Sequence, residues 1–156
     1  MKVKGFTLIE LIVTLLIGSI LLAWGVPNYR DFKLRRMVTD NVNNISYAMN
    51  LARAEAVRYG TNVIVERNGS NWQDGWTITA IGVGGNANTL IAQEDLMDDG
   101  MILELQNAPQ DRVVFNRLGG LVRNNVAQFE MRHNNMPNFR RNIFVTMSGS
   151  VRVVDI

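Results

Sequence analysis

An apolar run near the N-terminus constrains this chain of 156 residues more than any other feature. The run covers residues 6–26 and carries one charged side chain, Glu10. As an α-helix rising about 1.5 Å per residue it would measure roughly 31 Å, which matches the hydrocarbon core of a bilayer. We therefore expect a helix that spans a membrane. Lys2 and Lys4 precede the run, which predicts a cytoplasmic N-terminus and a position across the membrane for everything after residue 30.

Two ordinary interpretations of this run account poorly for Glu10. A secretory signal peptide fits the basic start and the loose small-x-small site at Ala23-Trp24-Gly25, but the apolar stretch is longer than usual. A plain anchor helix fits the length. Neither explains a carboxylate that costs about 2.5–3.5 kcal/mol at the centre of a bilayer. Glu10 therefore calls for a compensating partner.

Residues 5–10, GFTLIE, resemble the prepilin peptidase site of type IV prepilins. The resemblance implies cleavage between Gly5 and Phe6, methylation of the new Phe6 amine, and residues 1–5 as a leader peptide. Cleavage would create a positive amine four residues before Glu10. Because a buried charge is tolerated only when it is paired, the amine of one subunit could neutralise Glu10 of its neighbour. Glu10 is then an assembly residue, and the implied partners are the prepilin peptidase, the inner membrane and other pilins.

The residues after the apolar run predict that the same helix continues as an amphipathic stem. We assign 6–26 to a transmembrane helix and 27–60 to its continuation, with Gly60 as the stop. Gly18 and Pro27 either loosen the helix or, for Pro27, mark the membrane boundary. Asn41 and other asparagines fall largely outside the apolar face. Steps of three and four define that face, at Val38, Val42, Ile45, Met49, Ala52, Ala56 and Tyr59.

Residues 61–156 change to a β pattern, with alternating apolar residues and a strong turn signal at Asn68-Gly69. A helix followed by antiparallel strands is an α+β fold. The predicted strands cover 62–67, 76–81, 90–93, 102–105, 113–116, 128–132, 142–147 and 151–154.

This head resembles the GspH/FimT family of H-type minor pseudopilins and minor pilins. The resemblance lies in Trp72, in Gly75-Trp76, in the FNRLG segment 115–119 and in residues 143–153. It implies a type IV pilin-like fold, with a long N-terminal helix packed on an antiparallel sheet. It also implies a structural subunit of the bacterial inner membrane, with its head in the periplasm. Such a subunit joins the tip or initiation complex of a type II secretion pseudopilus or a type IV pilus. We expect Trp72 and Trp76 to pack the sheet.

The residues offer little for catalysis or for a cofactor. The chain has no cysteine and a single histidine, His133, which excludes thiolate sites and any site that needs two imidazoles. Ser148 and Ser150 flank Gly149 but do not form a nucleophile elbow. Glu94, Asp95, Asp98 and Asp99 offer oxygen ligands, yet their spacing is not that of a calcium loop and favours a solvated face. We expect no enzyme, no cofactor and no metal.

Charge is unevenly distributed along the head and raises the alternative of DNA binding. Residues 94–111 hold six acids and no base, whereas residues 112–152 hold seven arginines and one acid, Glu130. FimT-like minor pilins associated with DNA uptake carry a C-terminal Gly-Arg-x-Arg element, and this chain has Gly149-Ser150-Val151-Arg152 there. Arg140, Arg141 and Arg152 are the candidate DNA contacts. The other interpretation is a solvated or subunit-packing face.

Overall fold

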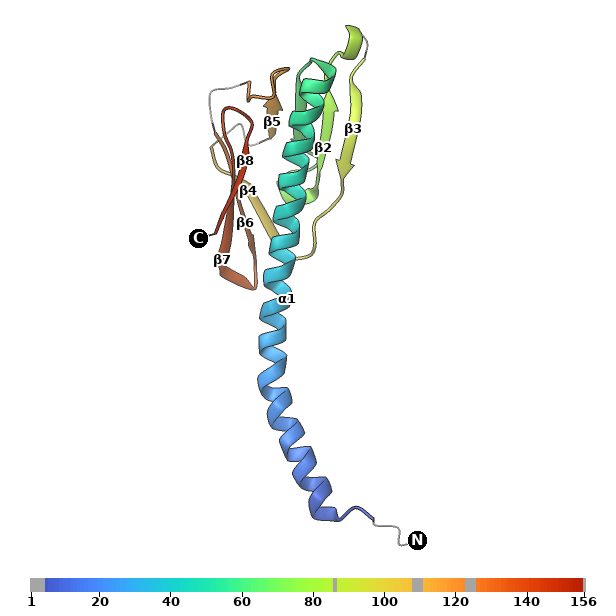
Figure 1. Cartoon of the computed structure of the whole chain (residues 1–156), viewed down its shortest axis with the longest axis vertical. Helices are drawn as coiled ribbons and strands as arrows, with labels where there is room; N and C mark the ends of the chain where they lie inside the picture. Colours follow the sequence, from blue (N-terminus) through green and yellow to red (C-terminus); the bar gives the residue numbers. More distant parts are fainter. Residues whose placement is uncertain (1–4, 86, 108–110, 123–125, 156) are drawn as a thin grey trace. The chain divides into compact units, whose positions relative to one another are not determined.

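The computed structural model describes residues 5–85, 87–107, 111–122 and 126–155. It divides the chain into two compact units, with the boundary between Arg35 and Arg36. One helix, α1 (Leu8–Tyr59), runs through both units and continues through Pro27 (Figure 1). The predicted long helix is therefore present, and it ends one residue before Gly60, whose φ of 66° suits glycine.

The second part of α1 buries one face in the head. The residues predicted to form the apolar face of the stem are buried, except that Tyr59 is only half-buried. The expectation for Asn41 was wrong, because this side chain is 6% exposed. Its amide donates to the Met37 carbonyl at 2.9 Å and to Asp98 Oδ2 at 3.0 Å, so burial leaves the amide donors bonded. The buried residues of this face are Val38, Asn41, Val42, Ile45, Ala48, Met49, Ala52 and Ala56.

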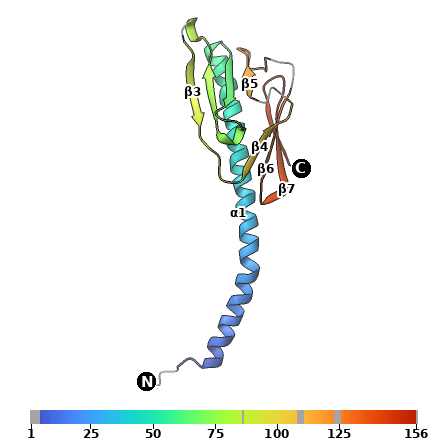
Figure 2. The same ribbon diagram turned by 180° about the vertical axis from the view of Figure 1, so that it is seen from behind.

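The head contains two antiparallel sheets of four strands each (Figures 1 and 2). The first has the order β3-β2-β1-β5, formed by β1 (Val63–Arg67), β2 (Trp76–Ala80), β3 (Thr89–Glu94) and β5 (Arg112–Phe115). The second has the order β4-β6-β7-β8, formed by β4 (Met101–Leu105), β6 (Ala127–His133), β7 (Met136–Val145) and β8 (Val151–Asp155). Short 3₁₀ turns lie at η1 (Trp72–Asp74) and η2 (Val83–Gly85).

Each predicted strand is present, but β7 begins six residues earlier than expected. β6 and β7 form a hairpin in which His133 pairs with Met136, and the register then shifts so that Arg132 pairs with Arg140. The extra residues on β7 form a bulge that contains Pro137. A proline cannot donate a hydrogen bond to a strand ladder, although it is tolerated at bulges. Pro137 therefore argued against a strand in the sequence, and this part of β7 was not predicted.

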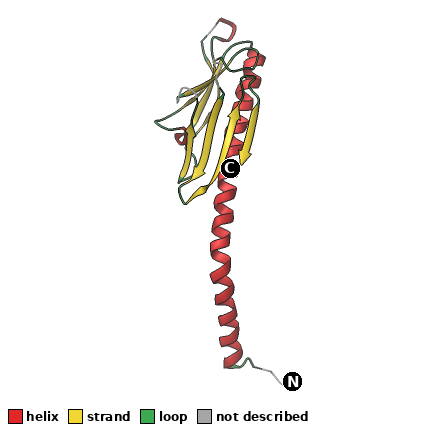
Figure 3. Ribbon diagram, turned by 90° about the vertical axis from the view of Figure 1, so that its left-hand side faces the viewer, coloured by secondary structure: helices red, strands yellow, loops and turns green. Residues whose placement is uncertain are grey.

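One hydrophobic core joins α1 to both sheets. Figure 3 shows the strands beside the second part of the helix. Trp72 and Trp76 are 2% and 3% exposed, which confirms that they pack the head. The Trp72 ring meets Phe129 edge-on, with centroids 5.0 Å apart and an interplanar angle of 87°. This contact packs η1, the turn between β1 and β2, against β6, a central strand of the second sheet.

Gly149 holds the turn between β7 and β8 against the loop after β5. Its φ is 78°, and an added Cβ would overlap the Gly119 carbonyl oxygen and lie 3.1 Å from Arg53 Cδ. We predict that Gly149→Ala destabilises the head by more than the roughly 1–2 kcal/mol of a left-handed backbone alone. Thermal unfolding of the full-length chain in detergent, followed by circular dichroism, measures this loss.

Gly82→Ala is the matched control for this substitution. Gly82 also has a positive φ, 60°, but its Cβ position has no atom within 4 Å. The stability loss of Gly82→Ala therefore measures the cost of the left-handed backbone without a steric overlap. Equal losses of melting temperature in the two variants would show that the close approach of Gly149 to Gly119 contributes nothing.

Candidate functional site

Glu10 closes the first turn of α1. Its Oε2 accepts hydrogen bonds from the Thr7 backbone N–H at 3.2 Å and from Thr7 Oγ1 at 3.1 Å. The Glu10 N–H donates in return to Thr7 Oγ1 at 3.3 Å. This reciprocal pair is a capping box, which satisfies backbone donors at the helix start. The spacing Thr-x-x-Glu is the ordinary sequence signal of this box, although it was not among the predicted features.

The Glu10 side chain is exposed, and no described cation forms an ion pair with it. A carboxylate that caps its own helix keeps part of its hydrogen-bonding capacity. The Glu10 carboxylate is therefore accessible to another molecule.

Gly5 and Phe6 precede the helix in non-helical backbone, and the Phe6 side chain is 76% exposed. A Cβ on Gly5 would meet nothing within 4 Å. The fold of this chain therefore gives no steric reason for glycine at position 5. Lys2 and Lys4 lie outside the described residues.

The first part of α1 is long and apolar enough to cross a membrane by length and composition, and it is the one such helix among the described residues. Its apolar side chains are exposed, for example Leu15 at 66% and Trp24 at 80%. The hydroxyls of Thr14 and Ser19 each donate to a carbonyl of the preceding turn at 2.8 Å. These polar groups are therefore satisfied inside the helix, as a hydrocarbon environment requires.

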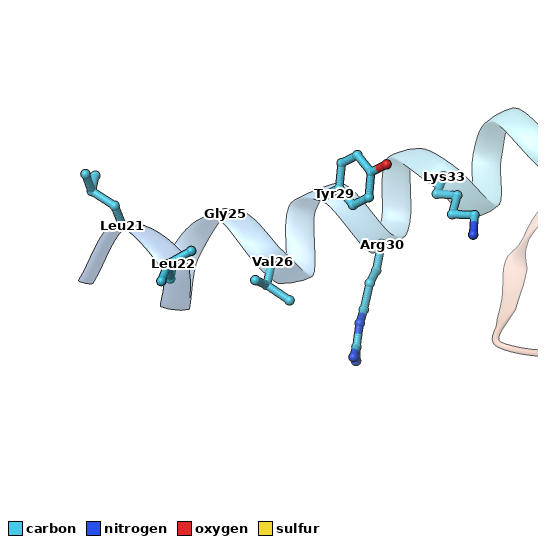
Figure 4. Close-up of a pocket in the computed structure, with 7 residues that line it drawn as sticks. All are labelled: Leu21, Leu22, Gly25, Val26, Tyr29, Arg30 and Lys33. Atoms are coloured by element: carbon cyan, nitrogen blue, oxygen red, sulfur yellow. The ribbon is translucent and has the colours of Figure 1, made fainter. Parts of the chain in front are cut away.

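A shallow hollow of about 410 Å³ lies along the helix where this apolar part ends (Figure 4). Gly25 supplies no side chain there, and Arg30 and Lys33 carry the charge at one end. A notch beside a small residue allows another helix to approach closely. The lining residues are Leu21, Leu22, Gly25, Val26, Tyr29, Arg30 and Lys33.

The structure does not bring Arg140, Arg141 and Arg152 together on one surface. Arg140 and Arg141 are consecutive on β7 and their side chains lie on opposite faces of the sheet. Arg141 lies over the Phe139 ring, 5.8 Å from its centroid. Arg152 pairs with Phe144, four positions from Arg140, which is about 14 Å along the strands. DNA binding by these three arginines stays a prediction.

A ladder of alternating charges crosses the outer face of the second sheet, and the sequence gives no local signal for it. Arg132 forms ion pairs with Glu104 at 2.9 Å and Glu130 at 2.8 Å, and Arg140 reaches Glu130 at 3.4 Å. The hydrogen bond to Glu104 raises the pKa of Arg132 above its usual value. Two acids balance two arginines, so the ladder itself has no net charge to attract a polyanion.

The arginine at the start of β5 is also paired. Arg112 donates through Nε and Nη2 to Asp111 Oδ2 at 3.0 and 2.9 Å. This hydrogen bond lowers the pKa of Asp111. Arg117 and Arg152 are exposed and form no ion pair within the described part of the chain, and Arg123 lies outside it. Three of the seven arginines between residues 112 and 152, namely Arg112, Arg132 and Arg140, are therefore paired with acids in the fold.

His133 has a structural position. It is 4% exposed, its Nε2 lies 3.1 Å from the Asp99 carbonyl, and its Nδ1 accepts the Asn135 N–H at 3.0 Å. Both ring nitrogens are thus occupied by backbone groups. Ser148 bonds Thr146 in a turn, with 3.0 Å between the hydroxyl oxygens. Among the described residues, no three His, Asp or Glu side chains gather as metal ligands would.

Comparison with known proteins agrees with this architecture. Residues 41–150 match the family described as Type II transport protein GspH, and residues 1–26 match the prokaryotic N-terminal methylation motif. Two fimbrial proteins of Pseudomonas aeruginosa are each 39% identical over 61 residues. That match spans 39% of this chain and 39% of each relative, so it covers less than half of their length.

Two solved structures share the fold. The type IV minor pilin FimU of Pseudomonas aeruginosa superposes with a TM-score of 0.63 at 15% identity, over 80% of this chain and 90% of FimU. The minor pseudopilin EpsH from the type 2 secretion system of Vibrio cholerae gives 0.57 at 12% identity, over 76% of this chain and 96% of EpsH. The predicted α+β, type IV pilin-like fold is confirmed, and these neighbours are structural subunits rather than enzymes. The family pattern covers most of the head, and the N-terminal part of the chain carries the methylation motif. The chain therefore belongs to the GspH family of type IV pilin-like proteins.

Proposed function

We propose that this chain is a minor pilin or pseudopilin that joins other pilin subunits in the tip or initiation complex of an envelope filament. The observation that carries the proposal is the exposed apolar start of α1, which bears one carboxylate, Glu10, near its beginning. Such a surface needs both a lipid or helical environment and a cationic partner. The solved neighbours come from a type IV pilus and from a type 2 secretion system, so the proposal covers both kinds of filament.

Maturation is the first step of the proposal. Residues 1–5 form the leader, the peptidase cuts between Gly5 and Phe6, and the Phe6 amine is methylated. Residues 6–26 then span the inner membrane, 27–60 continue the stem, and 61–156 complete the head. The exposed, non-helical backbone at Gly5 and Phe6 supports access by a peptidase.

Glu10 acts in assembly. Among the described residues of the single subunit, its carboxylate bonds only Thr7, within its own helix start. In a filament the new amine of a neighbouring subunit's Phe6 would replace part of that bonding and neutralise the charge. The pair forms only when two stems lie side by side at one relative height, so it sets the register of packing as well as its strength.

We predict that the mature protein begins at N-methylated Phe6. Mass spectrometry of the N-terminal peptide from membranes measures this directly. Gly5→Val should leave the protein folded, because the position is sterically open, but should leave residues 1–5 attached. A mature terminus at Val26 would instead show signal-peptidase cleavage and would remove the filament proposal.

We predict that Glu10→Gln lowers incorporation into filaments at least about tenfold, the effect of losing roughly 1.4 kcal/mol of pairing, while membrane insertion is retained. Quantitative immunoblotting of sheared filaments against membranes measures the ratio. Thr7→Ala is the control, because it removes the capping box and keeps the carboxylate. If Thr7→Ala lowers incorporation as much as Glu10→Gln, helix capping and not charge pairing is the role of Glu10.

We predict that the head lies in the periplasm. Cations follow the apolar run as well as precede it, at Arg30, Lys33, Arg35 and Arg36, so orientation needs a direct measurement. The chain has no cysteine, and Leu90→Cys introduces one at a side chain that is 59% exposed. A maleimide that cannot cross the inner membrane should label it in cells with a permeabilised outer membrane. Labelling only after the inner membrane is also opened would place the head in the cytoplasm.

A further inference from the structure

Two cations follow the apolar part of α1 without an ion pair in the described part of the chain. They are Arg30 and Lys33, and both side chains are exposed. By contrast, Arg36 Nε lies 3.7 Å from Asp40 Oδ2, so an acid of the same helix compensates part of its charge. Arg30 and Lys33 therefore carry charge that an anion from outside the chain can neutralise.

The acid of this segment, Asp31, lies on the other side of the helix. Successive residues of an α-helix are turned by about 100°, so Lys33 lies about 200° round the axis from Asp31. Gly25, Tyr29 and Lys33 are spaced four residues apart and share one face. This face carries the hollow of about 410 Å³ (Figure 4). The hollow thus has cations at one end and, within the described residues, no carboxylate in its lining.

The lining of the hollow changes from apolar to polar along the helix axis. Leu21, Leu22 and Val26 form the apolar end, and Gly25 leaves the middle without a side chain. Tyr29 follows and is 68% exposed. The two cations close the other end, and the whole segment rises about 18 Å. A groove that is apolar at one end and cationic at the other matches a molecule with an acyl chain and an anionic head.

The depth of the two cations suits the head groups of a bilayer. The apolar run ends at Val26, and Arg30 follows about 6 Å further along the helix. Long cationic side chains extend along apolar surface and place their charged ends at the membrane boundary. Tyrosine favours the same boundary, because its ring is apolar and its hydroxyl is polar. A lipid phosphate at this depth meets the cations while its acyl chain meets the apolar end.

Charge argues against a second copy of the stem in this hollow. The proposed pairing of the Phe6 amine with Glu10 of a neighbour offsets two stems by four residues, or about 6 Å in height. The cations of the second copy would then lie close to the height of Arg30 and Lys33. Like charges at that separation repel each other, whereas a lipid phosphate attracts both cations.

We propose that the hollow binds an anionic phospholipid of the leaflet in which the apolar run ends. Arg30 and Lys33 hold its phosphate, and an acyl chain lies along Leu21 and Val26. The inference rests on the proposed function for the insertion of residues 6–26 into a membrane. It adds a lipid ligand to the single subunit before assembly, when no neighbouring stem covers the apolar part of α1.

Such a lipid fixes the depth of Glu10. Twenty residues separate Glu10 from Arg30, or about 30 Å along the helix, which equals the thickness of the hydrocarbon core. When Arg30 is held at the head groups of one leaflet, Glu10 lies at the opposite boundary. The carboxylate then avoids the cost of the bilayer centre until a neighbour supplies an amine.

Quenching of tryptophan fluorescence by brominated lipids tests the site in the full-length chain. Tyr29→Trp combined with Trp24→Phe places an indole in the hollow and removes the other one in this part of α1. A chain with Trp24→Phe alone supplies the background from Trp72 and Trp76, which are buried in the head. The proteins are diluted into phosphatidylcholine vesicles. Phosphatidylglycerol or phosphatidylcholine with the same brominated chains is added in turn as a minor component.

We expect phosphatidylglycerol to associate with the hollow at least about five times more strongly than phosphatidylcholine, since one basic residue near the surface contributes about that factor. Arg30→Gln and Lys33→Gln should each lower this ratio, and the double variant should return it to about one. Arg36→Gln is the matched control, because it removes a cation that lies beyond the hollow and pairs with Asp40. It should leave the ratio unchanged.

Three results would overturn the proposal. One is a ratio near one in the chain that keeps both cations. Another is an equal loss of preference in Arg36→Gln and in the double variant, which would show diffuse attraction to the membrane surface. The third is loss of the preference on addition of millimolar glycerol phosphate, because the ligand would then be a phosphate in solution rather than a lipid.

The protein-to-lipid ratio distinguishes a lipid from another stem in the hollow. We expect the quenching to stay constant as the protein is diluted further into the vesicles. Weak quenching by both lipids that rises on dilution would show that a second stem fills the hollow. That result would also overturn the proposal.

The same experiment separates this inference from the proposed function. Absence of quenching by either lipid at every dilution would count against the membrane span, and so against both. Strong and equal quenching by the two lipids would overturn the lipid site alone. The vesicles need neither processing nor a neighbouring subunit, so Glu10→Gln should leave the lipid preference unchanged. Normal filament incorporation is therefore not required for the preference, and its failure would count against the proposed function alone.

Discussion

Burial of one face of α1 against two sheets is the interaction on which the head depends. Val38, Ile45 and Met49 are fully buried, and each contributes about 1.5–3 kcal/mol by leaving water. Near the end of the helix, Gly119 and Gly149 pack beside Arg53. The same helix begins with apolar side chains that the described chain leaves exposed. α1 thus contributes to the core of the head and also carries the exposed apolar surface that requires a membrane or another stem.

The two parts of α1 differ in what they require from outside the chain. From Val38 to Ala56 the apolar face is covered by the subunit's own strands, so the head needs no partner for its core. Before residue 27 the side chains are apolar on all sides, and the hydroxyls bond back to the helix. Glu10 is the exception. Its capping bonds to Thr7 stabilise the helix start without neutralising the carboxylate, which connects its local structural role to the proposed assembly role.

The arrangement of charge in the head shows how tertiary structure changes the meaning of a sequence pattern. Seven arginines in the last third of the chain indicate a basic surface. In the fold, Glu130 pairs with both Arg132 and Arg140, Glu104 pairs with Arg132, and the pleat directs Arg141 to the other face. Arg117 is left exposed beside Leu118, at the opposite end from the unpaired acids around Leu96. The arginines and acids that pair on the second sheet balance each other, whereas the two ends of the head keep opposite charges.

The sequence alone predicted the helix bounds, the strands and the family, because those depend on local periodicity, glycine and the run of apolar residues. It did not predict the burial of Asn41, whose amide is satisfied by Asp98, far along the chain. Nor did it predict the early start of β7, since Pro137 is acceptable only in a bulge that the pairing with β6 creates. The division into two sheets and the ion-pair ladder likewise arose from strand pairing. Local chemistry determined the elements, whereas the partners of each side chain were decided by which strands lie side by side.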